Sequence, residues 1–172
     1  MGFEDRQLHI LVVPYPAQGH INPMLQFAKR LASKNLKVSF VTTEANRKRM
    51  LEAQETTSGI SIKRGDVRFE TISDGLTSES ERSNVVIVSD MLYKVGDLML
   101  GNLIERLNAQ GEQISCIIQD SFLPWVTEVA KKFNIPSVFF WTHSCVFYSI
   151  YHHYVLRELG IFTLKNGVTR LI

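Results

Sequence analysis

Five short apolar runs alternate along the chain with segments whose apolar residues recur at helical spacing. This alternation constrains the fold more than any other feature. Short, nearly continuous apolar runs are typical of strands buried on both faces of a sheet. Strands that alternate with helices form a parallel sheet with helices on both faces. The sequence therefore predicts a doubly wound, Rossmann-like α/β fold, with strands at Leu8–Val13, Val38–Val41, Val67–Ile72, Ser115–Gln119 and Pro136–Trp141.

Helices are expected between these runs. Asn22 suits an N-cap and Pro23 the first helical position, so we expect the first helix to begin there and to stop near Asn35. Two polar stretches, Gln54–Asp66 and Thr77–Asn84, are predicted as loops, and the first can hold a short strand at Ile60–Ile62. The further helices are expected at Glu44–Ala53, Val88–Leu107, Pro124–Phe133 and His143–Leu159.

The composition excludes several classes of protein. A length of 172 residues fits one domain. The net charge of +2 is too balanced for a nucleic-acid or membrane-surface partner. No run approaches the roughly 18 apolar residues of a membrane helix, and acidic Glu4 and Asp5 precede an apolar run too short for a signal peptide. We therefore expect a cytoplasmic protein without nucleic-acid or membrane partners.

The topology predicts where a site should lie. In a doubly wound sheet, ligands bind beyond the carboxyl ends of the strands, at the point where strand order reverses. For the order 3-2-1-4-5, this point lies between strands one and four. The turn after strand one ends at His20, and strand four ends at Asp120. These two side chains are therefore expected side by side at one edge of the sheet.

A histidine beside a carboxylate can act as a general base. A neutral imidazole accepts a proton near pH 7, and a carboxylate on its other nitrogen fixes the tautomer. No G-x-S-x-G, G-x-G-x-x-G, P-loop or H-E-x-x-H motif occurs, so direct deprotonation of a bound substrate is the role that remains. A purely structural hydrogen bond of His20 is the alternative. Adjacent His152 and His153 point to different helix faces, and no metal site is expected there.

Three segments resemble the plant family-1 UDP-glycosyltransferases, and the resemblance covers essentially the whole chain. They are HILVVPYPAQGHINPMLQFAKRLASKNLKVSFVTT (His9–Thr43), ISDG (Ile72–Gly75) and CIIQDSFLPWVTEVAKKFNIPSVFFWTHSC (Cys116–Cys145). The resemblance implies the N-terminal half of a GT-B fold, with residues 1–172 as its acceptor-binding domain. It also implies inverting transfer of a sugar, usually glucose, from a UDP-sugar to a hydroxyl or carboxyl of a small lipophilic acceptor.

The same resemblance assigns roles to particular residues. His20 would be the catalytic base and Asp120 its partner. UDP-sugar would be a co-substrate, and neither a cofactor nor a metal would be required. The acceptor pocket would use the first turn, the ISDG loop and the start of the last helix, with aromatic walls for which core packing is the alternative. These acceptor residues are Gln18, Gly19, Asp74, Gly75, His143 and Ser144, and the aromatic residues are Phe122, Phe140, Trp141 and Phe147.

The family's donor-binding signature, an HCGWNS motif in a C-terminal domain, does not occur in this sequence. The resemblance therefore implies that the chain binds UDP-sugar weakly or not at all by itself, and that it is incomplete and inactive without that second domain. Two other functions stay open. One is a domain that binds a small molecule without chemistry, and the other is a hydrolase in which His20 and Asp120 activate water.

Overall fold

The computed structural model describes residues 7–56, 67–155, 162–163 and 169–170. The chain divides into two compact units, Met1–Phe140 and Trp141–Ile172, and each is described by itself. The short strand suggested at Ile60–Ile62 and the end of the last predicted helix lie outside the described residues.

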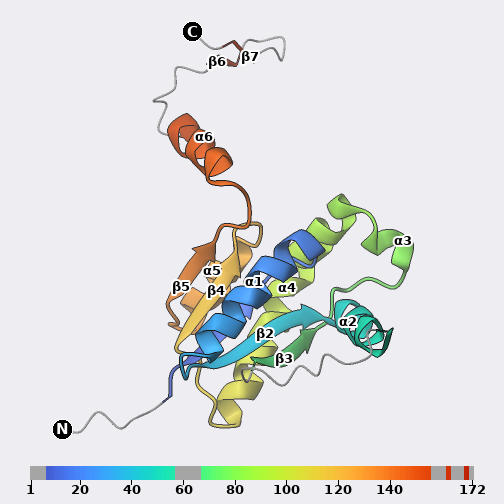
Figure 1. Cartoon of the computed structure of the whole chain (residues 1–172), viewed down its shortest axis with the longest axis vertical. Coiled ribbons are helices and arrows are strands. Elements are labelled where there is room, and N and C mark those ends of the chain that lie inside the picture. The colour runs from blue at the N-terminus through green and yellow to red at the C-terminus, as the bar shows by residue number, and fades with distance from the viewer. Residues whose placement is uncertain (1–6, 57–66, 156–161, 164–168, 171–172) are drawn as a thin grey trace, which may run out of the picture. The chain divides into compact units, whose positions relative to one another are not determined.

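The first unit contains a five-stranded sheet in which every neighbouring pair is parallel (Figure 1). The strand order is β3-β2-β1-β4-β5, so the predicted order and the predicted α/β class are confirmed. Since β1 and β4 are neighbours, their carboxyl ends lie at the same edge. The strands are β1 (His9–Val13), β2 (Lys37–Thr43), β3 (Val67–Ile72), β4 (Cys116–Asp120) and β5 (Ser137–Phe140).

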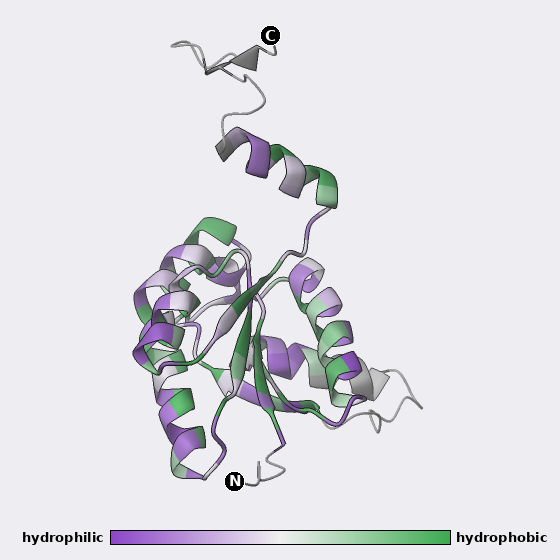
Figure 2. Cartoon of the chain, turned by 90° about the vertical axis from the view of Figure 1, so that its left-hand side faces the viewer, coloured by the Kyte–Doolittle hydropathy of each residue, from purple (hydrophilic) through white to green (hydrophobic). Residues whose placement is uncertain are grey.

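Two apolar clusters lie on opposite faces of this sheet. Ile10 and Val12 of β1 pack with Met24 of helix α1 (Gln18–Ala32). Leu11 and Val13 pack instead with helices α4 (Val85–Ala109) and α5 (Trp125–Lys132). Because successive residues of a strand face opposite sides, both faces of β1 are buried, and its sequence is a continuous apolar run. Figure 2 shows the apolar strands enclosed between the helices.

Helix α1 begins at Gln18, and the predicted start at Asn22 is wrong. The Ala17 carbonyl accepts the N–H groups of both His20 and Ile21 at 2.9 Å, which opens the helix ahead of the proline. Pro23 lies inside α1, where the helix loses only the one backbone hydrogen bond that proline cannot donate. His20 is therefore fixed in the first turn of a helix and does not lie in the loop before it.

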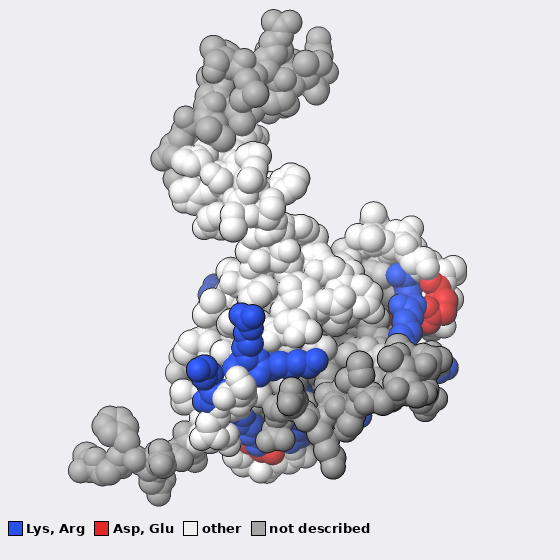
Figure 3. All heavy atoms as spheres, in the orientation of Figure 1, with Lys and Arg blue, Asp and Glu red and all other residues white. Residues whose placement is uncertain are grey.

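The remaining helices of the first unit are α2 (Glu44–Thr56) and α3 (Glu79–Arg82). On the face shown in Figure 3, basic side chains gather over the end of α1, whose last turn carries Lys29 and Arg30. Cations at a helix C-terminus interact favourably with its dipole. This basic group lies at the opposite end of α1 from His20.

The second unit contains helix α6 (Cys145–Val155) and a short antiparallel pair, β6 (Phe162–Thr163) and β7 (Thr169–Arg170). The antiparallel pair was not predicted, because residues after Gly160 follow neither period. Nowhere in the described parts of either unit is a helix long and apolar enough to span a bilayer.

Candidate functional site

His20 and Asp120 meet at the carboxyl ends of β1 and β4. The distance from His20 Nδ1 to Asp120 Oδ2 is 2.8 Å. The His20 side chain is 12% exposed, whereas the Asp120 side chain is completely buried. The predicted proximity is confirmed. A carboxylate accepts hydrogen bonds, so the contact selects the imidazole tautomer that carries its hydrogen on Nδ1.

The second oxygen of Asp120 is also engaged. Asp120 Oδ1 accepts the backbone N–H of Phe122 at 2.9 Å. The carboxylate is therefore held at both oxygens, and its plane is fixed relative to the segment that follows β4. A buried carboxylate held in this way presents Oδ2 to the imidazole in one orientation.

Aromatic rings surround the imidazole. The ring centroid of Phe122 lies 4.9 Å from that of His20, and the centroid of Tyr15 lies 5.2 Å from it. Phe122 is 48% exposed, so one side of its ring is open to solvent. Gln18 and Gly19 are exposed beside His20 in the first turn of α1, and a Cβ on Gly19 would meet no atom of the described residues within 4 Å. The surface around His20 is therefore partly apolar and open.

Asp74 is held by its own loop. Arg82 Nε donates to Asp74 Oδ2 at 2.9 Å, and the Leu76 N–H donates to Asp74 Oδ1 at 3.0 Å. Burial acts to raise the pKa of Asp74, but the hydrogen bonds from Arg82 and Leu76 outweigh it and hold that pKa below its usual value. Gly75 follows with φ 71°, and a Cβ there would lie 2.8 Å from Met91 Cε. The Asp74 carboxylate therefore organises the loop that follows β3.

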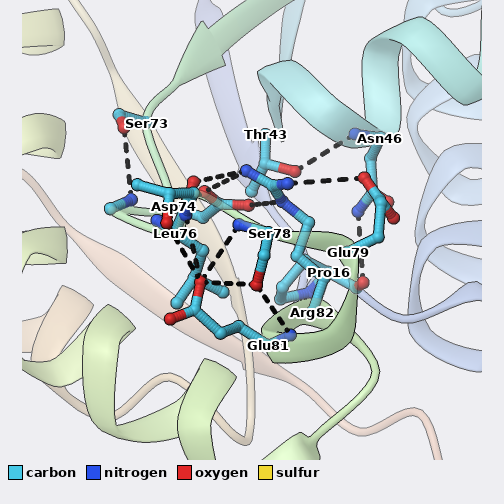
Figure 4. Close-up of polar contacts among 12 residues, drawn as sticks. Pro16, Thr43, Asn46, Ser73, Asp74, Leu76, Ser78, Glu79, Glu81 and Arg82 are labelled. Carbon is cyan, nitrogen blue, oxygen red and sulfur yellow. Dashed lines mark hydrogen bonds and ion pairs between the residues drawn. The ribbon is translucent and has the colours of Figure 1, made fainter.

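The short helix α3 extends this polar network (Figure 4). The Ser78 side chain accepts the N–H of Glu81, and the Glu81 carboxylate accepts the N–H of Ser78 at 3.0 Å, which forms a capping box. Arg82 contacts Asp74 and Glu79, and Arg49 of α2 also pairs with Glu79. The stretch Thr77–Asn84, predicted as a loop, thus contains a capped helical turn anchored to its surroundings.

The remaining predicted acceptor residues lie in different parts of the structure. Phe140 packs on Phe27 of α1, with ring centroids 5.1 Å apart, so its contact is core packing. Trp141, His143 and Ser144 belong to the second unit, where Trp141 Nε1 donates to the Ser144 carbonyl at 3.1 Å. Their proximity to His20 remains a prediction. The described residues contain no group of three or more His, Cys, Asp or Glu side chains arranged to hold a metal ion.

Two small hollows adjoin the turn between β1 and α1, and His20 lines neither of them. The lining of the first is mainly apolar, whereas the second combines polar residues, Asp74 and Arg82 among them, with apolar ones. The first is lined by Val13, Pro14, Pro16, Val41, Thr42, Thr43, Ile72, Leu92, Leu123 and Trp125. The second is lined by Pro16, Thr43, Asn46, Arg49, Asp74, Arg82 and Val88.

Another histidine, which is buried, lies at the opposite end of β1. His9 is 2% exposed, and its Nε2 lies 2.9 Å from Ser39 Oγ. Burial, followed by the nearby Lys37 charge, lowers the pKa of His9. His9, Tyr15 and Arg82 were not predicted from the sequence as site residues. Tyr15 lies between two prolines in the turn before His20, and this is the sequence signal that could have identified it.

Comparison with known proteins gives a consistent result. A family model described as the glycosyltransferase N-terminal domain matches residues 6–73. Gallate 1-beta-glucosyltransferase 84A23 of Punica granatum is 37% identical over 156 residues, which cover 90% of this chain and 31% of the relative. (R)-mandelonitrile beta-glucosyltransferase of Prunus dulcis is 39% identical over 164 residues, which cover 92% and 34% respectively.

Solved structures share the fold. The crystal structure of Os79 from O. sativa in complex with UDP has a TM-score of 0.69 and 28% sequence identity. The match covers 87% of this chain and 32% of the Os79 chain. The chain therefore spans about a third of the length of the proteins it matches.

Proposed function

Because this chain carries the N-terminal domain of the plant family-1 UDP-glycosyltransferases, we propose that it supplies the acceptor site and the catalytic base of an inverting sugar transferase. The sugar, glucose by this proposal, passes from a UDP-sugar to a hydroxyl or carboxyl of a small lipophilic acceptor. UDP-sugar binds mainly through a C-terminal domain that these residues do not include.

The hydrogen bond between His20 Nδ1 and Asp120 Oδ2 carries the proposal. With its hydrogen on Nδ1, the imidazole has its lone pair on Nε2. Nε2 takes the proton of the acceptor hydroxyl, and the acceptor oxygen forms a bond to the anomeric carbon. The bond from that carbon to the UDP oxygen breaks, and UDP leaves from the opposite face. Asp120 stabilises the resulting imidazolium without taking its proton.

The acceptor class follows from two observations. The surface beside His20 is partly apolar, through Phe122, and it is open. Two relatives carry gallate and (R)-mandelonitrile in their names, both small molecules with hydroxyl or carboxyl groups. In our proposal Asp74 holds the loop that follows β3 in its conformation. The proposed acceptor contacts in the first unit are Gln18, Gly19, Gly75 and Phe122. For Trp141, His143 and Ser144, an acceptor contact is what the family resemblance implies.

The test is sugar transfer by this chain joined to a family C-terminal domain. With UDP-glucose and a hydroxyl acceptor, His20→Ala should reduce kcat by roughly 10²–10⁴-fold, the usual contribution of a positioned base. Gln26→Ala, an exposed position on the same helix, is the control and should keep the parental rate. Retention of activity within a few-fold by the His20 variant would show that the base is elsewhere.

Two further measurements separate the alternatives. Calorimetry that detects acceptor binding, with no transfer after the C-terminal domain is added, would favour a binding domain without chemistry. Product analysis without any sugar donor would reveal a hydrolase, since only hydrolysis of the acceptor proceeds under those conditions.

A further inference from the structure

Tyr15, in the turn between β1 and α1, forms a three-ring cluster with His20 and Phe122. The centroids of Tyr15 and His20 are 5.2 Å apart with planes tilted by 57°, and those of His20 and Phe122 are 4.9 Å apart with a tilt of 50°. Tyr15 and Phe122 are themselves 5.9 Å apart in an edge-to-face contact. Tyr15 is 4% exposed, so the cluster connects the core to the partly open Phe122. Tilted ring pairs at these separations are attractive.

The Tyr15 hydroxyl anchors this cluster to helix α4. Tyr15 Oη lies 3.1 Å from Ser89 Oγ and donates to the Val85 carbonyl at 3.4 Å. Both partners lie near the start of α4, a 25-residue helix packed against the sheet. Since a phenol can donate one hydrogen bond and also accept, Ser89 supplies the donor and Val85 the acceptor. The position of the Tyr15 ring is therefore set by a long, packed helix.

From this geometry we propose that Tyr15 is a positioning residue for His20, and this inference rests on the proposed function of His20 as a base. The Asp120 hydrogen bond fixes one nitrogen of the imidazole. Contact with the anchored Tyr15 ring restricts rotation of the imidazole about that bond and helps to keep Nδ1 directed at Asp120. Reactive groups are held in productive geometry by such supporting contacts.

The first test uses this chain alone and needs no sugar transfer. Long-range ¹H–¹⁵N NMR spectra report which imidazole nitrogen carries the hydrogen. We expect the parent to hold His20 in the Nδ1–H tautomer. Tyr15→Leu, which removes the ring, should show a mixture of tautomers, and Tyr15→Phe, which removes only the hydroxyl, should show a smaller change. The control is Phe40→Leu, a truncation of a fully buried aromatic on β2 whose printed ring contact is with Phe69.

A double-mutant cycle covers the case in which Tyr15→Leu does not fold. Tyr15→Phe removes both hydrogen bonds of the Tyr15 hydroxyl, and Ser89→Ala removes one of them. We expect Ser89→Ala to shift the tautomer ratio of His20 no more than Tyr15→Phe does, and the double variant to shift it no further than Tyr15→Phe. Additive shifts, or none in any folded Tyr15 variant, would overturn the positioning role while leaving the proposed function intact.

The second test measures kinetics with the C-terminal domain present. Tyr15→Leu should lower kcat by about tenfold, because the base is then held less firmly in its productive orientation, and leave KM for the acceptor unchanged. A raised KM with unchanged kcat would make Tyr15 an acceptor contact and contradict the proposal. If His20→Ala keeps full activity, the proposed function fails instead, and that result does not depend on the NMR spectra of the Tyr15 variants.

Discussion

Gly96 of α4 lies so close to Trp125 of α5 that a Cβ on Gly96 would be 2.7 Å from Trp125 Cζ2. Trp125 is buried and cannot move aside as the end of a flexible chain could. We predict that Gly96→Ala lowers the free energy of unfolding by about 1–3 kcal/mol, the usual effect of overpacking. This should hold although alanine is the better helix former. Urea unfolding measures the change.

Gly101, on the same helix, is the matched control. A Cβ there would lie 3.7 Å from the Phe133 ring, which is ordinary contact. Gly101→Ala should therefore raise the free energy of unfolding by about 0.5–1 kcal/mol, because alanine loses less backbone entropy in a helix. A similar change in both variants would mean that the Trp125 contact does not limit the packing.

Asp120→Asn should impair sugar transfer almost as severely as His20→Ala. The amide can present its NH₂ to His20 Nδ1, which favours the tautomer with its hydrogen on Nε2. The Nε2 lone pair that should take the substrate proton is then lost. The substitution also removes the charge that stabilises the imidazolium. We expect kcat to fall by about two orders of magnitude or more. Asp90→Asn, at an exposed aspartate paired with Lys94, is the control for loss of one carboxylate.

The Asp74–Arg82 pair should make stability depend on acidic pH. Because the pKa of Asp74 is lowered in the folded state, the unfolded chain binds its proton first as pH falls. The stabilisation is therefore complete above the unfolded pKa of about 3.9 and is lost as pH falls through the folded value. Urea unfolding from pH 6 to pH 2.5 should show this loss in the parent and a weaker one in Arg82→Gln. If the free energy of unfolding falls equally with pH in both proteins, Arg82 does not hold the Asp74 carboxylate ionised.

His9 should make stability depend on pH in a higher range than Asp74 does. Its pKa is lowered by burial, so the unfolded state binds the proton between about 6.5 and the folded value. The free energy of unfolding should fall as pH drops from 7, by at most about 1.4 kcal/mol per pH unit from this one group, and level off below the folded pKa. His9→Gln, whose amide can still reach Ser39, should lack this slope. If the free energy of unfolding of the variant depends on pH as in the parent, groups other than His9 cause that dependence.

The strand positions, the strand order and the His20–Asp120 contact could all be predicted from the sequence. They depend on apolar periodicity and on the rule that ligands bind at the switch point. The start of α1 could not, because the preference of proline for the first helical position favoured Pro23 over a start at Gln18. A single missing hydrogen bond was tolerated there, since α1 buries Ile21 and Met24 against the sheet.

Several side-chain contacts could not be predicted from the sequence either. Arg82 follows Asp74 closely, but nothing in its spacing indicates that its guanidinium turns back onto that carboxylate. Likewise, Tyr15 meets Ser89 only because α4 packs beside the end of β1. Such pairs depend on side-chain directions that appear only when helices and strands are assembled.

The backbone ladder between β1 and β4 selects the chemical group that reaches His20. Val13 pairs with Gln119, and the next residue, Asp120, points to the opposite face. Gln119 Nε2 donates to Thr127 of α5 at 2.8 Å, whereas Asp120 meets His20. A slip of one residue would exchange these environments, giving the imidazole an amide and burying a carboxylate under α5. The register of this ladder, and not the length of a neighbouring loop, therefore determines that a carboxylate faces the imidazole.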